Sequence, residues 1–208
     1  MSDALDYLLK VRPEAMKAYF EFVRASGRHL DEKTRAIISV ITKVDNQTEA
    51  GFRQYLNRAL RAGVTADEML DALLAAFPTL GLSKIVWAMD ILLEMDIPEF
   101  RPENLGRGTG WHDVIADQDL RDATVTHTGC DGRELFIYRE GAEIRVYDSR
   151  CPHQATQIPG DALAGCTLTC PRHGWKFDLQ SGDCIERGDR PLTRFEHKVE
   201  NGRLLVRW

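Results

Sequence analysis

The stretch that decides the fold of the C-terminal half runs from residue 151 to residue 177 and reads CPHQATQIPGDALAGCTLTCPRHGWKF. Its pattern is C-x-H-x16-C-x-x-H, with Cys151 and His153 in one short segment and Cys170 and His173 in another. Each segment offers one thiolate and one imidazole. A [2Fe–2S] cluster with two Cys on one iron and two His on the other needs this ligand set. Neutral imidazoles leave the second iron less negative, which raises the reduction potential above that of an all-Cys cluster.

The residues around these ligands are typical of stiff metal-binding loops. Pro152 and Pro171 each follow a Cys, and proline fixes φ and removes a backbone donor. Gly174 lets the chain turn beside His173. The alternative for the same four side chains is a Cys2His2 zinc site. Zinc sites more often use C-x-x-C pairs, and the aromatic HGWKF tail has no role at zinc, so the cluster is the favoured interpretation.

This stretch resembles the Rieske ferredoxin family in its ligand spacing, in the HGWKF tail and in the Ser-Gly turn that follows. The resemblance implies that Cys151 and Cys170 hold one iron, and that His153 and His173 hold the other. It also implies an electron carrier that exchanges single electrons with a partner protein.

The chain departs from the respiratory-chain members of that family. Those carry one more Cys in each loop, joined as a disulfide, where this chain has Thr156 and Arg172. They also place Ser and Tyr where this chain has Trp175 and Phe177. Hydroxyl hydrogen bonds to the cluster sulfurs raise the potential. Without them we expect the low end of the Rieske range, about −150 mV, which suits an oxygenase-type ferredoxin.

Composition bounds the remaining possibilities. The chain has 208 residues, 43% of them hydrophobic and 28% charged, with a net charge of −5. No Lys/Arg run suggests a nucleic-acid partner, and the net charge alone is too small to specify a protein partner. The N-terminal stretch does not have the form of a signal peptide, and no run approaches the roughly 20 apolar residues of a membrane helix. We therefore expect a cytoplasmic protein that does not bind a membrane.

Three cysteines stay outside the proposed ligand set. Cys130, Cys166 and Cys184 are an odd number in a compartment expected to be reducing. Free, partly buried thiols are the favoured interpretation over a disulfide.

The first hundred residues are predicted to be helical throughout. Pro13 is expected to open a helix that ends at Gly27, and Asp31 to cap the next. A third is expected from about residue 48 to 62. Thr65 and Glu68 have the capping-box form, and the helix they begin is predicted to break at Pro78 and Gly81. Ser83 is expected to cap the last helix, which ends before Pro98.

The order of these segments resembles the carboxymuconolactone decarboxylase and alkyl hydroperoxidase D-like family over roughly residues 10 to 96. The resemblance implies an all-α domain that assembles into oligomers. Peroxidatic members carry a C-x-x-C pair, a His and a Glu. The two Cys positions fall here at Thr48 and Gly51, the His position at Tyr55, or at Gln54 with a one-residue slip, and the Glu position at Ala36. A thiol relay needs a thiolate and a proton shuttle, so peroxidase activity by that route is not expected.

A decarboxylase role needs only an acid or base and an anion pocket. The side chains that could contribute are His29, Arg35, Lys43, Arg53, Tyr55 and Arg58. The favoured interpretation is that they are solvent-facing positions on helices.

The second half changes character after a Pro- and Gly-rich segment, IPEFRPENLGRGTG at residues 97–110, which reads as a linker. Short alternating strands follow, including two hairpins, the second with an Asn201-Gly202 type I′ turn. His112, His127 and His197 lack a matching Cys and are expected to be ordinary histidines. The predicted fold is α+β by segregated domains: an all-α domain over residues 1–96, a linker over 97–110 and an antiparallel β domain over 111–208.

The predicted function is electron transfer on a Rieske-type [2Fe–2S] cluster, between a reductase and an oxygenase. The helical domain would be a catalytically degenerate scaffold that forms homo-oligomers or binds a ligand. The alternative is an oxidoreductase or decarboxylase in which the helical domain binds a small aromatic or lactone acid and the cluster supplies electrons. The absence of a second His/His/carboxylate iron site in the helical half weighs against that alternative.

Overall fold

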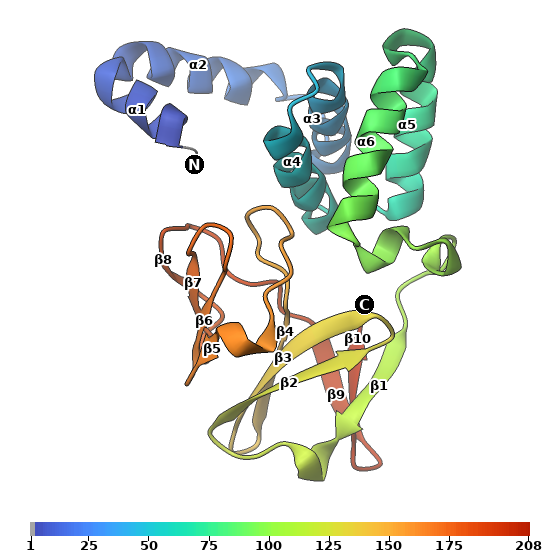
Figure 1. Cartoon of the computed structure of the whole chain (residues 1–208), viewed down its shortest axis with the longest axis vertical. Helices are drawn as coiled ribbons and strands as arrows, with labels where there is room; N and C mark the ends of the chain where they lie inside the picture. The colour runs from blue at the N-terminus through green and yellow to red at the C-terminus, as the bar shows by residue number, and fades with distance from the viewer. Residues whose placement is uncertain (1–2) are drawn as a thin grey trace.

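The computed structural model describes residues 3–208 and shows a helical half followed by a β half (Figure 1). The helices are α1 (Asp3–Val11), α2 (Pro13–Ser26), α3 (Glu32–Asp45), α4 (Glu49–Arg61), α5 (Ala66–Leu80) and α6 (Leu82–Met95). The predicted class, helices first and antiparallel strands second, is confirmed. None of the helices among these residues is long and apolar enough to cross a membrane.

Most of the predicted helix boundaries are also confirmed. The Asp31 side chain accepts a hydrogen bond from the Thr34 N–H, and the Thr65–Glu68 capping box forms in both directions. Two predictions are wrong. Pro78 does not end α5, because it lies in the last turn of the helix. Proline has no N–H to donate to the carbonyl of Leu74, but Leu74 is exposed, so water can reach that carbonyl.

The second wrong prediction is the start of α6. Gly81 caps both neighbouring helices: its N–H donates to the Phe77 carbonyl at the end of α5, and its carbonyl accepts from Ile85 in α6. Its φ of +80° is a backbone conformation that glycine adopts without strain, which allows the sharp turn between the two helices. Because Gly81 is the N-cap, Ser83 is the second residue of α6 and not its cap.

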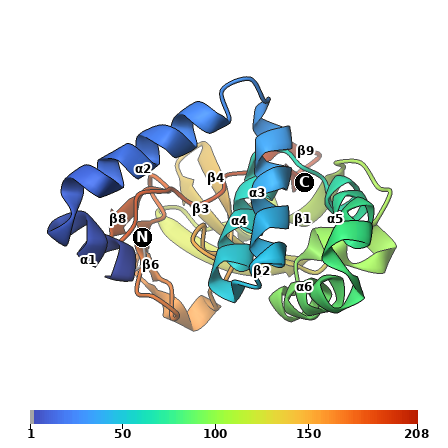
Figure 2. The same cartoon turned by 90° about the horizontal axis from the view of Figure 1, so that it is seen from above.

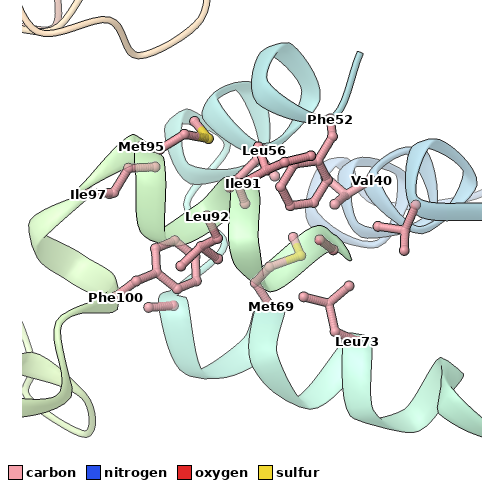
Figure 3. Packing of buried hydrophobic residues seen from close by; sticks show 14 of the residues in the cluster. Val40, Phe52, Leu56, Met69, Leu73, Ile91, Leu92, Met95, Ile97 and Phe100 are labelled. Atoms are coloured by element: carbon pink, nitrogen blue, oxygen red, sulfur yellow. The ribbon is translucent and has the colours of Figure 1, made fainter. Parts of the chain in front are cut away.

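The helical core is formed by α3 to α6 (Figure 3). Val40 of α3, Phe52 and Leu56 of α4 and Met69 of α5 are fully buried. The α1–α2 hairpin lies apart from this bundle (Figures 1 and 2), and α2 buries none of its residues. Two of its aromatic side chains, Tyr19 and Phe22, are more than half exposed.

The β half contains three antiparallel sheets. The first has the order β1 (Trp111–Ala116), β10 (Arg203–Arg207), β9 (Glu196–Glu200). The second has β2 (Thr124–Cys130), β3 (Arg133–Glu140), β4 (Glu143–Asp148). The third has β5 (Leu163–Ala164), β6 (Thr167–Thr169), β7 (Lys176–Asp178), β8 (Cys184–Glu186). The predicted β9–β10 turn is present, with positive φ at Asn201 and Gly202.

The segment predicted as a linker is ordered and packed. It contains two short 3-10 helices, Pro98–Phe100 and Pro102–Asn104, and Phe100 is buried in the helical core. Glu99 forms an ion pair with Arg133, which also pairs with Asp148 at 2.6 Å. The Arg150 guanidinium donates to the carbonyl of Asp96 at 2.8 Å. These contacts fix the helical half against the end of β4.

Candidate metal centre

The two predicted ligand segments have the same backbone geometry. In residues 151–156 and 170–175, the N–H of the leading Cys donates to the carbonyl five residues later, at 2.9 and 2.8 Å. The carbonyl of the same Cys accepts from the N–H four residues later, at 3.0 and 2.9 Å. The fourth residue after each Cys has positive φ: 54° at Ala155 and 67° at Gly174. We call these segments loop 1 and loop 2.

The strands beside each loop place the Cys and His side chains of both loops at one tip of the β half. Loop 1 follows β4 after two residues, and loop 2 lies between β6 and β7, which pair directly through Thr169 and Lys176. The core beneath the loops consists of fully buried side chains that include Phe136, Ile158 and Phe177. The loops therefore rest on a rigid base.

The two thiols lie together inside this tip. Cys151 and Cys170 are 1% and 0% exposed and hydrogen-bond to each other. That hydrogen bond lowers the pKa of Cys170 to about 6, and backbone N–H groups of Arg172 and His173 favour its thiolate further. The same hydrogen bond, together with burial, raises the pKa of Cys151. The pair therefore favours a thiolate at Cys170 and a thiol at Cys151, and binding of iron has to displace the Cys151 proton.

The two imidazoles form a second pair. The Nδ1 atoms of His153 and His173 are 3.2 Å apart, and the ring centroids are 4.6 Å apart. Burial, followed by the neighbouring His173, lowers the pKa of His153 to about 4, and burial also lowers the pKa of His173. Both rings are therefore neutral at physiological pH, which is the metal-binding form. Two nitrogens bound to one metal ion at about 2.1 Å lie roughly 3.4 Å apart in tetrahedral geometry, close to the observed separation.

Trp175 covers the imidazole pair on one side. Its indole is stacked on His153, with centroids 4.9 Å apart and 4° between the planes, and Arg190 lies 5.6 Å from its centroid. Gly188 leaves room for the indole, since a Cβ there would lie 2.2 Å from a Trp175 ring carbon. No motif in the sequence marks Gly188, because its role depends on contact with Trp175 in the folded chain.

We expect Gly188→Ala to weaken retention of a bound metal centre. The added methyl must displace the Trp175 indole, and such a change beside a ligand typically costs about 10–100-fold in metal affinity. The measurement is the rate of iron release to a chelator. Gly108→Ala is the matched control, because nothing lies within 4 Å of its added methyl. Equal release rates for the two variants would contradict the role assigned to Gly188.

The helical half covers loop 1, a contact that no motif in the sequence predicts. Asn57 of α4 donates through Nδ2 to the carbonyl of Pro152 at 3.1 Å and approaches that of Cys151 at 3.5 Å. Ala155 is 4% exposed and packs into the helical core. No motif marks Asn57, because its role depends on a contact between residues 95 positions apart.

A cavity of about 930 Å³ lies beside this contact, between the helical and β halves. Its apolar lining includes Leu60, Val64 and Trp208, and Pro152 of loop 1 also faces it. It is separate from the thiol and imidazole pairs.

The other histidines and thiols singled out in the sequence lie elsewhere. His112 contacts Asp131 at 2.7 Å, and His127 contacts Glu134 at 3.0 Å. Cys130, Cys166 and Cys184 are free, as expected. Burial, followed by the adjacent Asp131, raises the pKa of Cys130 to about 11, which makes its thiol a poor nucleophile.

One expectation for the helical half is wrong. Arg53 is not on a solvated face: it is 7% exposed and pairs with Glu49 at 2.8 Å and Glu94 at 2.6 Å. His29, Arg35 and Arg58 are exposed, as expected. Lys43 and Tyr55 are half-buried and form a cation–π contact at 4.9 Å.

A thiol pair and an imidazole pair, presented by two matched loops at the tip of an antiparallel β fold, are the features of a mixed Cys/His iron–sulfur domain. The model of the Rieske [2Fe-2S] domain matches residues 110–196, and that of the carboxymuconolactone decarboxylase family matches residues 13–94. The chain belongs to the Rieske [2Fe–2S] family through its C-terminal half, and its N-terminal half is similar to the carboxymuconolactone decarboxylase family. A Rieske-type [2Fe–2S] cluster is accordingly its cofactor.

Curated relatives match the Rieske half. The ferredoxin component of the alkene monooxygenase system of Xanthobacter autotrophicus is 30% identical over 95 residues, which are 45% of this chain and 78% of that protein. Cholesterol 7-desaturase of Hemicentrotus pulcherrimus is 34% identical over 93 residues, 44% of this chain but 19% of the desaturase. The chain therefore spans about a fifth of that relative.

Among solved structures, one chain of the oxygenase–ferredoxin complex of carbazole 1,9a-dioxygenase is similar. It shares 28% identity over 46% of this chain and 91% of that chain, with a TM-score of 0.37.

Proposed function

We propose that Cys151 and Cys170 hold one iron of the cluster, and that His153 and His173 hold the other. The observation that carries this assignment is the pairing of like ligands by two loops of identical hydrogen-bond pattern. A dinuclear cluster takes one pair on each iron. The low pKa of Cys170 and the neutral imidazoles fit those positions.

We further propose that the protein is a ferredoxin-type carrier that passes single electrons from a reductase to an oxygenase. When bound, the cluster accepts and releases one electron at a time. The chain's own residues do the rest: the thiols are buried, Trp175 covers His153, and the exposed His173 brings one imidazole edge to the surface. The name of the relative from Xanthobacter autotrophicus, a ferredoxin component of a monooxygenase system, supports this role.

The helical unit, residues 1–96, acts in this proposal as a scaffold, joined through residues 97–110 to the β unit, residues 111–208. Its contacts through Asn57 and Ala155 hold loop 1. Its exposed apolar side chains, among them Phe22, Leu74 and Leu93, offer surfaces for homo-oligomer formation. Thr48 and Gly51 occupy the positions where a thiol relay needs Cys, so the scaffold carries no peroxidatic pair.

The test is the absorption and EPR spectrum of the purified protein before and after dithionite. We expect a brown protein whose reduced form gives a signal averaging below g = 2, and a midpoint potential toward the low end of the Rieske range, about −150 mV. Light scattering on the same sample reports the oligomeric state. A colourless sample with stoichiometric zinc would overturn the electron-transfer proposal.

A further inference from the structure

The two ligand loops differ in what surrounds them. Loop 1 is covered by the helical half, through Asn57 and the buried Ala155. In loop 2, Pro171, Arg172 and His173 are exposed. Loop 2 is therefore the more open of the two loops to a partner protein.

Three arginines surround the exposed loop. Arg172 belongs to loop 2 itself, the side chain of Arg187 lies against Gly174, and the guanidinium of Arg190 lies over the Trp175 ring. We call this group, Arg172, Arg187 and Arg190, the arginine rim. It has the sign opposite to the net charge of the chain, which is −5.

Nearby acids neutralise the arginine rim only weakly. Glu186 lies 3.8 Å from Arg187 but pairs more closely with Lys176, at 2.6 Å. Asp189 lies 3.6 Å from Arg190 and is largely solvated. Among the side chains of residues 5–208, no carboxylate lies within ion-pair distance of Arg172.

The arginine rim lies beside the imidazole pair. Arg172 immediately precedes the exposed His173. The guanidinium of Arg190 lies over the ring of Trp175, which is itself stacked on His153. The rim and the exposed imidazole edge therefore form one surface.

We propose that the arginine rim around His173 is the docking surface for a redox protein with an acidic patch. The proposal rests on the electron-transfer function above and adds the sign of the partner's surface. Attraction between the positive rim and an acidic patch on the partner steers diffusional encounter and orients the two proteins. Since the net charge of the chain is negative, an acidic partner is repelled from the rest of the surface and attracted at the tip, which selects one orientation.

The test uses small charged oxidants in place of the unidentified partner. The dithionite-reduced protein passes one electron to hexacyanoferrate(III), which becomes hexacyanoferrate(II), or to the cation tris(phenanthroline)cobalt(III), which becomes the cobalt(II) complex. Raising the ionic strength from about 0.01 M to 0.15 M shortens the screening length from about 30 Å to about 8 Å. We expect the rate with the anionic oxidant to fall several-fold, and the rate with the cationic oxidant to rise.

The variant Arg172→Glu should lower the rate with hexacyanoferrate(III) several-fold at low salt. Its matched control is Arg121→Glu, which makes the same change in net charge at an exposed site between η3 (Asp117–Asp119) and β2. A rate with the anion that rises with salt, or that falls equally in both variants, would overturn the docking proposal.

A second readout does not depend on redox activity. Hexacyanochromate(III) is a redox-inert paramagnetic anion, and its binding broadens amide NMR signals near it. Broadening concentrated at residues 187–190 and lost in Arg172→Glu supports the arginine rim. Broadening elsewhere, or none, overturns it. A protein without a reducible cluster would give no oxidation signal and would remove the proposed function, while the broadening would still report on the rim.

Discussion

The variant Cys170→Ala is expected to lose the visible absorption of the cluster and the EPR signal of its reduced form. Cys170 is 0% exposed, and hydrogen bonds from Cys151 and from two backbone N–H groups favour its thiolate, which alanine cannot supply. Changes beside a metal ligand already cost about 10–100-fold in affinity, and removal of a ligand costs more. Iron content and the absorption spectrum of the purified variant check this expectation.

Cys184→Ala is the matched control for this prediction. Cys184 is also a thiol in the β half, half-buried against the same core, but it lies on β8, outside both loops, and its Sγ donates to the Glu186 carbonyl at 3.3 Å. We expect it to keep the wild-type spectrum. Far-ultraviolet circular dichroism of both variants should stay close to wild type, because the helices contain no cysteine. A cluster that survives Cys170→Ala, or is lost in Cys184→Ala, would remove the ligand assignment.

The features that could be predicted from sequence are those with a local cause. The ligand spacing, the prolines after each Cys and the turn-forming Gly174 all lie within one stretch, because a metal loop needs those residue types close together. The Thr65–Glu68 capping box forms as predicted for the same reason. A cap is satisfied within four residues, so its pattern is visible without knowledge of the fold.

The features that could not be predicted depend on contacts between distant residues. Arg53 looks like a surface arginine, but Glu94, 41 residues away, comes to it when α4 packs on α6. Asn57 reaches loop 1 for the same reason. The charge of the docking face is also hidden, since the net charge of −5 averages over the chain while Arg172, Arg187 and Arg190 gather at one tip.

Arg133 is the residue whose loss should most destabilise the protein. It is 2% exposed and joins Glu99 of the segment between the two halves to Asp148, which is 8% exposed and lies at the end of β4. Its guanidinium also lies over the rings of Phe195 and Trp208, at 5.0 and 5.5 Å. A single side chain thus connects the helical half, the strand that leads to loop 1 and the C-terminal hairpin.

We expect Arg133→Leu to lower the free energy of unfolding by about 3–5 kcal/mol, because it leaves the carboxylate of Asp148 buried without its cation. Burial already raises the pKa of Asp148, and Arg133 is the largest influence that opposes this rise. Urea denaturation followed by circular dichroism measures the loss. Arg203→Leu is the matched control: its partner Asp113 is 2.7 Å away, but both side chains are about half exposed, so we expect a loss below about 1 kcal/mol.

The double variant Arg133→Leu/Asp148→Leu separates the ion pair from simple packing. Removing both charges leaves no buried carboxylate unpaired, and apolar replacement of a buried pair is often neutral or stabilising. We therefore expect the double variant to be more stable than Arg133→Leu, although Glu99, which is partly exposed, still loses its partner. A double variant as unstable as the single one would show that the cation–π contacts with Phe195 and Trp208, and not the neutralisation of Asp148, account for the stabilisation by Arg133.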